Sequence, residues 1–192
     1  IIRKRHVFAK ISRPEVAIQF MSPPPVEMLQ ALAHQGKLTN LECQLALQLP
    51  VAEDITIESD SGGHTDNRPL MPLFSEIACA RDALIEKYHY PTPIRLGAAG
   101  GIGTPLAVAS AFSLGAAYVL VGSIHQSAVE SGVAEASKEL LAHANLADVM
   151  MAPAADMFEM GVNLQVLKKG TLFGLRAKKL YEVYRSYASI EE

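Results

Sequence analysis

The stretch Ile94–Ser123, IRLGAAGGIGTPLAVASAFSLGAAYVLVGS, predicts a strand, a glycine loop, a helix, a second strand and a second glycine loop. Its first part, Ile94–Ala98, is a short apolar run that lies between Pro93 and a group of glycines, which is typical of a strand buried on both faces. A second apolar run, Ala117–Val121, follows Gly115, the residue predicted to end the helix. Two buried strands joined through a helix indicate parallel pairing and therefore an α/β fold.

Each of these two predicted strands ends in a glycine turn. In the first turn, Gly100-Gly101 lets the backbone approach a ligand closely, and Thr104-Pro105 supplies the N-cap and first residue of the following helix. The second turn is Gly122-Ser123. Because the carboxyl ends of neighbouring parallel strands meet at one edge, both turns are expected to present backbone N–H groups there, one set near a helix N-terminus. The pattern predicts a phosphate-binding site.

The same stretch allows two other interpretations. No residue from Leu96 to Val129 carries a full charge, which is long enough for a membrane span. The six glycines of Leu96–Ile124 cluster where strands turn instead of along one helix face, which argues against a membrane helix. A dinucleotide-binding fingerprint is incomplete, because Gly101-Ile102-Gly103 is followed by Thr104-Pro105-Leu106 without a third glycine. A barrel-type phosphate site is therefore favoured.

The composition narrows the class of protein further. The chain has 192 residues, 49% of them hydrophobic, and a mean hydropathy of +0.17, as expected where helices cover parallel strands. A net charge of -3 and a pI of about 6.1 argue against a nucleic acid as the main partner. The two cysteines, Cys43 and Cys79, lack metal-ligand spacing and indicate a reducing, cytoplasmic compartment.

The number of predicted strands is small for a complete barrel. Three strands are expected at Asp54–Glu58, Ile94–Ala98 and Ala117–Val121, with a weaker one at Val7–Ile11, whereas a closed (β/α)8 barrel typically needs about 250 residues. Because the chain also lacks an initiator Met, we expect the C-terminal part of a TIM barrel from a longer chain, with an open α/β sheet as the alternative. Residues 1–192 are interpreted as one partial barrel domain, with a helical insertion over about 22–50 and a helical C-terminal extension over about 150–192.

A polar loop, SDSGGHTD at residues 59–66, follows the first of these strands. His64 stands behind two glycines, so its ring can approach a planar ligand, and imidazole ionises near neutral pH, which suits proton transfer. Three neighbours in the sequence could orient or charge this histidine: Asp60, Thr65 and Asp66. The structural alternative is a turn histidine that caps backbone groups. No set of His, Cys and Asp residues has metal-ligand spacing.

Three motifs in this order, Gly-Gly-His, Ala-Ala-Gly-Gly-Ile and Gly-Ser, resemble those of the FMN-dependent barrel family of nitronate monooxygenases (2-nitropropane dioxygenases) and flavin enoyl reductases. A closer resemblance is to the PfaD family, the trans-acting enoyl reductases of polyunsaturated-fatty-acid synthases and trans-acyltransferase polyketide synthases. It covers nearly the whole chain and rests on the segments AKISRPEVA, DSGGHTDNRPL, RLGAAGGIGTP, VGSIHQ, MAPAADMFEMGVNLQVLKKGT and RAKKLYEVY.

The resemblance implies an FMN-binding (β/α)8 barrel in which NADPH reduces the flavin and the flavin passes hydride to an enoyl thioester on an acyl carrier protein. By motif, the residues expected to bind the cofactor are Gly62, Gly63, Ala99, Gly100, Gly101, Gly122 and Ser123. The last four of these would hold the FMN phosphate, and His64 would lie over the isoalloxazine ring as the catalytic acid/base residue. The part of the barrel expected before Ile1 would also contact the flavin ring. A nitronate monooxygenase and a non-catalytic phosphate-binding or interaction module are the alternative functions.

The C-terminal region is basic. Residues 168–185 contain six basic residues and one acidic residue, a net charge of +5 in a chain whose total is -3. A solvated helix face is one interpretation of this segment. The other is a docking patch for an acidic acyl carrier protein.

Overall fold

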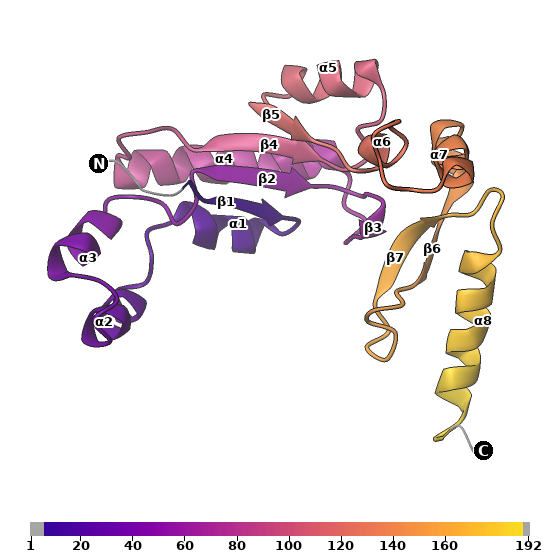
Figure 1. Cartoon of the computed structure of the whole chain (residues 1–192). Helices are drawn as coiled ribbons and strands as arrows, with labels where there is room; N and C mark the ends of the chain where they lie inside the picture. Colours follow the sequence, from indigo (N-terminus) through magenta and orange to yellow (C-terminus); the bar gives the residue numbers. More distant parts are fainter. Residues whose placement is uncertain (1–5, 190–192) are drawn as a thin grey trace. The chain divides into compact units, whose positions relative to one another are not determined.

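The computed structural model describes residues 6–189, which form two compact units. The first unit contains residues 6–59 and 68–120, and the second contains residues 60–67 and 121–189. Figure 1 shows the elements of both units, coloured along the sequence. Within the described residues, no helix has both the length and the apolar character that a membrane crossing requires.

The first unit is built on a four-stranded parallel sheet in the order β1-β2-β4-β5. Its strands are β1 (Phe8–Ile11), β2 (Asp54–Glu58), β4 (Arg95–Ala99) and β5 (Tyr118–Leu120). The chain passes from β2 to β4 through α4 (Leu70–Tyr88) and from β4 to β5 through α5 (Pro105–Ser113). The α/β fold with a parallel sheet is confirmed, and its closure into a barrel stays a prediction.

Three helices, α1 (Pro14–Met21), α2 (Val26–His34) and α3 (Asn40–Ala46), separate β1 from β2. The last two supply the helices expected within residues 22–50, and they lie beside each other in Figure 1. A capping box opens α3, because the Thr39 hydroxyl accepts from the Glu42 amide at 3.2 Å and the Glu42 carboxylate accepts from the Thr39 amide at 2.8 Å.

One face of the parallel sheet forms the apolar core of this unit. Ile55 and Ile57 of β2 are completely buried, and Leu96 of β4 is almost so. Helices α1 and α4 pack against these strands and against each other, and Phe74 and Ile77 of α4 are buried there. Burial of such side chains contributes roughly 1.5–3 kcal/mol each, so this layer supplies much of the stability of the unit.

Polar side chains of the same strands form hydrogen bonds and an ion pair with one another. The Asp54 carboxylate accepts from Arg95 Nε at 2.6 Å and from its terminal nitrogen at 2.7 Å, and it also contacts His6. Burial raises the pKa of Asp54, but hydrogen bonds from Arg95 and His6 outweigh that effect and hold the pKa below its ordinary value. The hydroxyls of Thr56 and Tyr118 lie 2.9 Å apart and link β2 to β5. These pairs satisfy polar groups that the sheet would otherwise bury without partners.

The last strand of the sheet differs from its expected burial. The sequence predicted a buried strand over Ala117–Val121, but Tyr118 and Val119 are half-buried and Leu120 is 38% exposed. The reason is that β5 pairs only with β4 and forms an edge of the described sheet.

The second unit contains a small antiparallel sheet in the order β3-β7-β6. Its strands are β3 (Gly63–His64), β6 (Val149–Pro153) and β7 (Asn163–Leu167), and the accompanying helices are α6 (Ser123–Gln126), α7 (Glu135–Ala142), η1 (Leu146–Asp148) and α8 (Phe173–Ser186). The prediction of a helical extension over about 150–192 is therefore wrong for its first part. Antiparallel pairing of β6 with β7 decides the structure there, and only α8 is helical within 150–189.

Helix α8 packs directly on β6 at a glycine. A Cβ atom added to the buried Gly174 would lie 2.5 Å from the Met150 sulfur, so a larger residue there would force the methionine side chain to move. The methionine-rich segment 149–160 thus contributes packing against a helix.

Candidate functional site

The loop after β4 contains two consecutive glycines in the left-handed backbone conformation. Gly100 and Gly101 have φ angles of 96° and 68°, a left-handed conformation that favours glycine. The Ser59 hydroxyl lies 3.0 Å from the Ala99 carbonyl and 3.2 Å from the Gly100 carbonyl and donates to these oxygens, which fixes the direction in which both carbonyls point. Over residues 6–189, the amides of Gly101 and Ile102 donate to no protein acceptor, although Ile102 is buried. These amides can therefore serve an anionic ligand.

Helix α5 begins just after this loop as the sequence predicted. The Thr104 hydroxyl accepts from the Ala107 amide at 3.2 Å, and Pro105 occupies the first turn. The N-terminal end of α5, which favours negative charge, therefore lies four residues along the chain from Gly101.

The Gly-Ser turn lies in the second unit together with the histidine loop. Gly122 is the N-cap of the short helix α6, and a side chain there would meet no atom within 4 Å. A Cβ atom at Gly62 would lie 3.3 Å from the Ser123 hydroxyl oxygen. The structure therefore brings Gly62 and Ser123, two predicted cofactor-binding residues from distant segments, into close proximity.

The histidine loop is held by β7 of the second unit. Gly63 and His64 form β3, and their register partners in β7 are Gln165 and Leu164. The Gln165 side-chain amide donates to both oxygens of the Asp60 carboxylate at 3.3 Å. The Thr65 hydroxyl also donates to Asp60 at 3.3 Å. Asp60 thus fastens the loop at a point four residues before His64.

An aspartate far along the chain makes the ionic contact of His64. The His64 Nε2 atom lies 3.4 Å from Asp156 Oδ1, and the two side chains are 44% and 64% exposed. The sequence pointed to Asp60, Thr65 and Asp66 as residues that could orient or charge His64. Of these, Asp60 and Thr65 contact each other, and Asp60 also contacts Gln165. Asp156 belongs to the segment MAPAADMFEM, which carries part of the family resemblance but no spacing that links it to His64.

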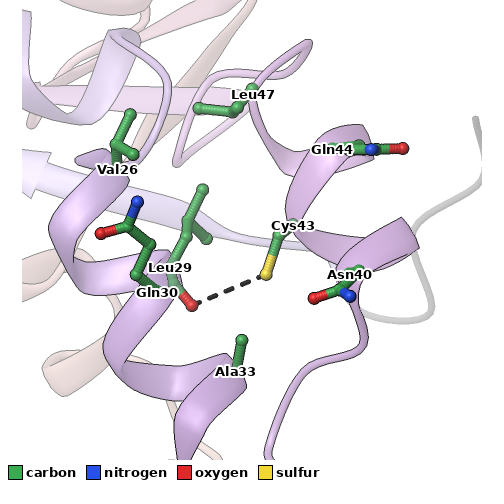
Figure 2. Close-up of a pocket in the computed structure, with 8 residues that line it drawn as sticks. All are labelled: Val26, Leu29, Gln30, Ala33, Asn40, Cys43, Gln44 and Leu47. Atoms are coloured by element: carbon green, nitrogen blue, oxygen red, sulfur yellow. Dashed lines mark hydrogen bonds between the residues drawn. The ribbon is translucent and has the colours of Figure 1, made fainter.

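A cavity of about 330 Å³ lies between α2 and α3 in the first unit (Figure 2). Cys43 points toward the neighbouring helix there, and its thiol donates to the Leu29 carbonyl at 3.6 Å. None of the predicted site residues lines this cavity; its lining consists of Val26, Leu29, Gln30, Ala33, Asn40, Cys43, Gln44 and Leu47. Among residues 6–189, no group of three or more His, Cys, Asp and Glu side chains could hold a metal ion.

Comparison with known proteins gives consistent matches over the whole chain. The family model of nitronate monooxygenase matches residues 4–185. The polyketide biosynthesis protein PksE of Bacillus subtilis is 50% identical over 192 residues, which is all of this chain and 25% of that protein. A polyunsaturated fatty acid synthase subunit from a Thraustochytrium species is 46% identical over 99% of this chain and 13% of that protein. The chain therefore spans a quarter or less of the length of these two relatives.

Among solved structures, the enoyl reductase domain of MlnA, from the macrolactin biosynthesis cluster of Bacillus amyloliquefaciens, superposes with a TM-score of 0.92. It is 41% identical, and the match covers all of this chain and 43% of that one. FabK from Thermotoga maritima superposes with a TM-score of 0.59 at 21% identity, covering 94% of this chain and 43% of FabK, which is a likeness of fold alone.

Proposed function

The chain belongs to the nitronate monooxygenase family, and we propose that it is part of an FMN- and NADPH-dependent enoyl reductase that acts on enoyl thioesters carried by an acyl carrier protein. The observation that carries this proposal is the likeness of the whole chain to the enoyl reductase domain of MlnA, at a TM-score of 0.92 and 41% identity. The relatives from polyketide and polyunsaturated-fatty-acid synthesis support the same substrate class.

Residues of this chain fit the phosphate of FMN on structural grounds. The left-handed Gly100 and Gly101, the unused amides of Gly101 and Ile102, and the N-terminus of α5 together suit a bound anion. In the parallel sheet, Ala99 pairs in register with Leu120, and Gly122 follows Leu120 by two residues. We assign phosphate binding to Gly100, Gly101, Gly122 and Ser123. Bound FMN would supply hydride transfer between NADPH and the enoyl double bond.

His64 is assigned the role of acid/base residue. Its Nε2 atom lies 3.4 Å from Asp156 Oδ1, so this carboxylate is placed to orient the ring. The Nδ1 atom has no protein partner within residues 6–189 and remains available to exchange a proton with the substrate. The Gln165–Asp60 hydrogen bonds hold the loop that carries the His64 ring. The ring therefore keeps its orientation from one turnover to the next.

Three basic residues of α8, Lys178, Lys179 and Arg185, are assigned to docking of the acyl carrier protein. Lys178 and Arg185 are exposed and lie seven residues apart, which places them on one face of the helix. Lys179 is paired with Glu182 at 3.3 Å, an exposed pair that contributes little to stability and can be exchanged for a partner's carboxylate.

The function is tested by combining a flavin spectrum with a reoxidation experiment. The protein is incubated with FMN, its flavin absorbance is recorded, and the flavin is reduced with NADPH without oxygen. Reoxidation by an enoyl thioester under anaerobic conditions is the expected result. The family match makes a nitronate monooxygenase the second candidate, and oxygen-dependent nitronate oxidation without enoyl reduction would establish that function instead. Protein that stays colourless with FMN would refute both.

A further inference from the structure

A groove in the second unit lies between the end of β6, the segment after it, and helix α8. Its volume of about 630 Å³ falls within the range of about 300–1,000 Å³ found for small-molecule sites. The residues that line it are almost all apolar: Pro153, Ala155, Phe158, Leu172, Phe173, Arg176, Ala177 and Leu180. The composition of this surface suits a hydrocarbon chain.

One side of α8 faces the groove. The lining residues contributed by α8 and its N-cap occur at i, i+1, i+4, i+5 and i+8 from Leu172, which is the spacing of a single helix face. Arg176 is the one charged side chain of this face that lines the groove, and it has no ion-pair partner within residues 6–189. An unpaired guanidinium beside an apolar surface suits a ligand that combines an apolar chain with an anion, above all a phosphate.

One wall of the groove belongs to the segment that also contacts His64. Ala155 lines the groove, and the next residue, Asp156, contacts His64. Phe158 also lines the groove, and its ring packs edge-on against Tyr181 of α8 with ring centroids 5.2 Å apart. The aromatic contact ties the segment after β6 to the helix, so both sides of the groove are held together.

We propose that this groove binds the acyl chain of a thioester whose pantetheine arm carries a phosphate, and that Arg176 pairs with that phosphate. The inference rests on the proposed function for the identity of the ligand. Beyond that function, it states where the acyl chain binds and which residue recognises the phosphate. The apolar face selects for chain length, and the guanidinium selects for the phosphorylated form.

Calorimetric titration of the full chain, without flavin or NADPH, tests the groove directly. The probes are the phosphopantetheine thioesters of saturated acids, dodecanoyl and butanoyl, and dodecanoyl-pantetheine that lacks the phosphate. We expect the dodecanoyl thioester to bind at least tenfold more tightly than the butanoyl one, because its additional methylenes remove more apolar surface from water. Loss of the phosphate should weaken binding about fivefold or more. Absence of binding, or equal affinity for both chain lengths, would overturn the proposal.

Two matched pairs of variants locate the binding. Leu180 and Leu175 are 60% and 62% exposed, but only Leu180 lines the groove. Leu180→Ala should weaken dodecanoyl binding about fivefold while Leu175→Ala leaves it unchanged. Arg176→Gln should abolish the preference for the phosphorylated probe, whereas Arg81→Gln, at an arginine of α4 that does not line the groove, should not. Equal effects within either pair would place the ligand outside the groove.

A groove-filling variant gives a second, independent readout. Ala177→Phe should remove the dependence on chain length, and Ala136→Phe at an exposed position of α7 is the control. Thermal unfolding of each variant verifies that the fold is retained. Because the probes cannot be reduced, binding with this variant pattern supports the groove even if enoyl reduction fails. Enoyl reduction with normal chain-length dependence in Ala177→Phe would refute the groove and leave the proposed function intact.

Discussion

Substitution of Gly97 by alanine would force atoms together inside the parallel sheet. A Cβ atom built on Gly97 would lie 2.1 Å from Cε2, 2.3 Å from Cζ and 2.6 Å from Cδ2 of the Tyr118 ring. Carbon atoms in contact normally lie about 3.5–4.0 Å apart, so the ring would have to leave its position. The ring cannot move freely, because the Tyr118 hydroxyl is bonded to Thr56 at 2.9 Å.

The magnitude follows from these two contacts. Overpacking of a well-packed interior costs about 1–3 kcal/mol, and the Thr56–Tyr118 hydrogen bond contributes roughly 0.5–1.5 kcal/mol more. We therefore expect Gly97→Ala to lower the free energy of unfolding by about 2–4 kcal/mol, a large part of the roughly 5–15 kcal/mol of a typical domain. Urea unfolding followed by circular dichroism measures the change as a lower midpoint at unchanged slope.

A double variant, Gly97→Ala with Tyr118→Ala, tells whether the loss of stability comes from steric overlap with the ring or from the smaller backbone freedom of alanine. With the ring removed by Tyr118→Ala, the additional cost of Gly97→Ala should fall below about 1 kcal/mol, so the two substitutions are strongly coupled. Gly103→Ala is the control, because a Cβ atom there meets no atom within 4 Å. Two results would refute the placement of the ring over Gly97. One is a free energy of unfolding of Gly97→Ala within about 0.5 kcal/mol of that of the unsubstituted protein, and the other is additive effects in the double variant.

Four further outcomes are expected. Gly101→Val should lower FMN affinity at least about tenfold, or about 1.4 kcal/mol, in a flavin-fluorescence titration, and stoichiometric flavin retention would contradict the loop assignment. His64→Ala should keep bound flavin while kcat falls about a hundredfold, and loss of flavin at unchanged turnover per bound flavin would reverse its role. Reversal of Lys178 and Lys179 to Glu should raise KM for carrier-bound substrate in a salt-dependent manner and leave a small soluble thioester unaffected, and equal effects on both would make this an ordinary surface. Because the folded pKa of Asp54 is lowered, its contribution to stability is present above about pH 4 and is lost as the pH falls through the folded value, so Asp54→Asn should flatten the acid-unfolding curve.

The parts of the fold that local signals specify could be predicted from the sequence. Thr104 with Pro105 predicted the start of a helix, and the Thr104 hydroxyl caps α5 by accepting from the Ala107 amide three residues along. The strands expected at Asp54–Glu58 and Ile94–Ala98 became β2 and β4 within one residue, because strands buried under helices need apolar side chains in short runs.

The support of the histidine loop could not be predicted in the same way. Gln165 reaches Asp60 across 105 positions, and Asp156 reaches His64 across 92, through a strand pairing that involves only two residues of the loop. A two-residue strand has no detectable alternation, and Pro153 at the end of β6 weakens the strand signal of that segment. Sequence neighbours of His64 were therefore the natural candidates for its partner, although the tertiary pairing supplies a different one.

Helix α8 separates two kinds of contact on its two sides. Leu172, Arg176 and Leu180 repeat every four residues and line the groove, while Lys178 and Arg185 lie close to the opposite side at 100° per residue. A carrier-bound substrate would contact both sides of α8, with its acyl chain in the groove and the carrier on the basic side. Because α8 is one rigid helix, no flexible linker separates these two contacts. Their salt dependences should then differ, because the basic side attracts an exposed acidic surface through solvent while the groove buries apolar area. Raising the ionic strength should therefore weaken recognition of the carrier and preserve the preference for long acyl chains, and a parallel loss of both would mean that one side of the helix accounts for all of the binding.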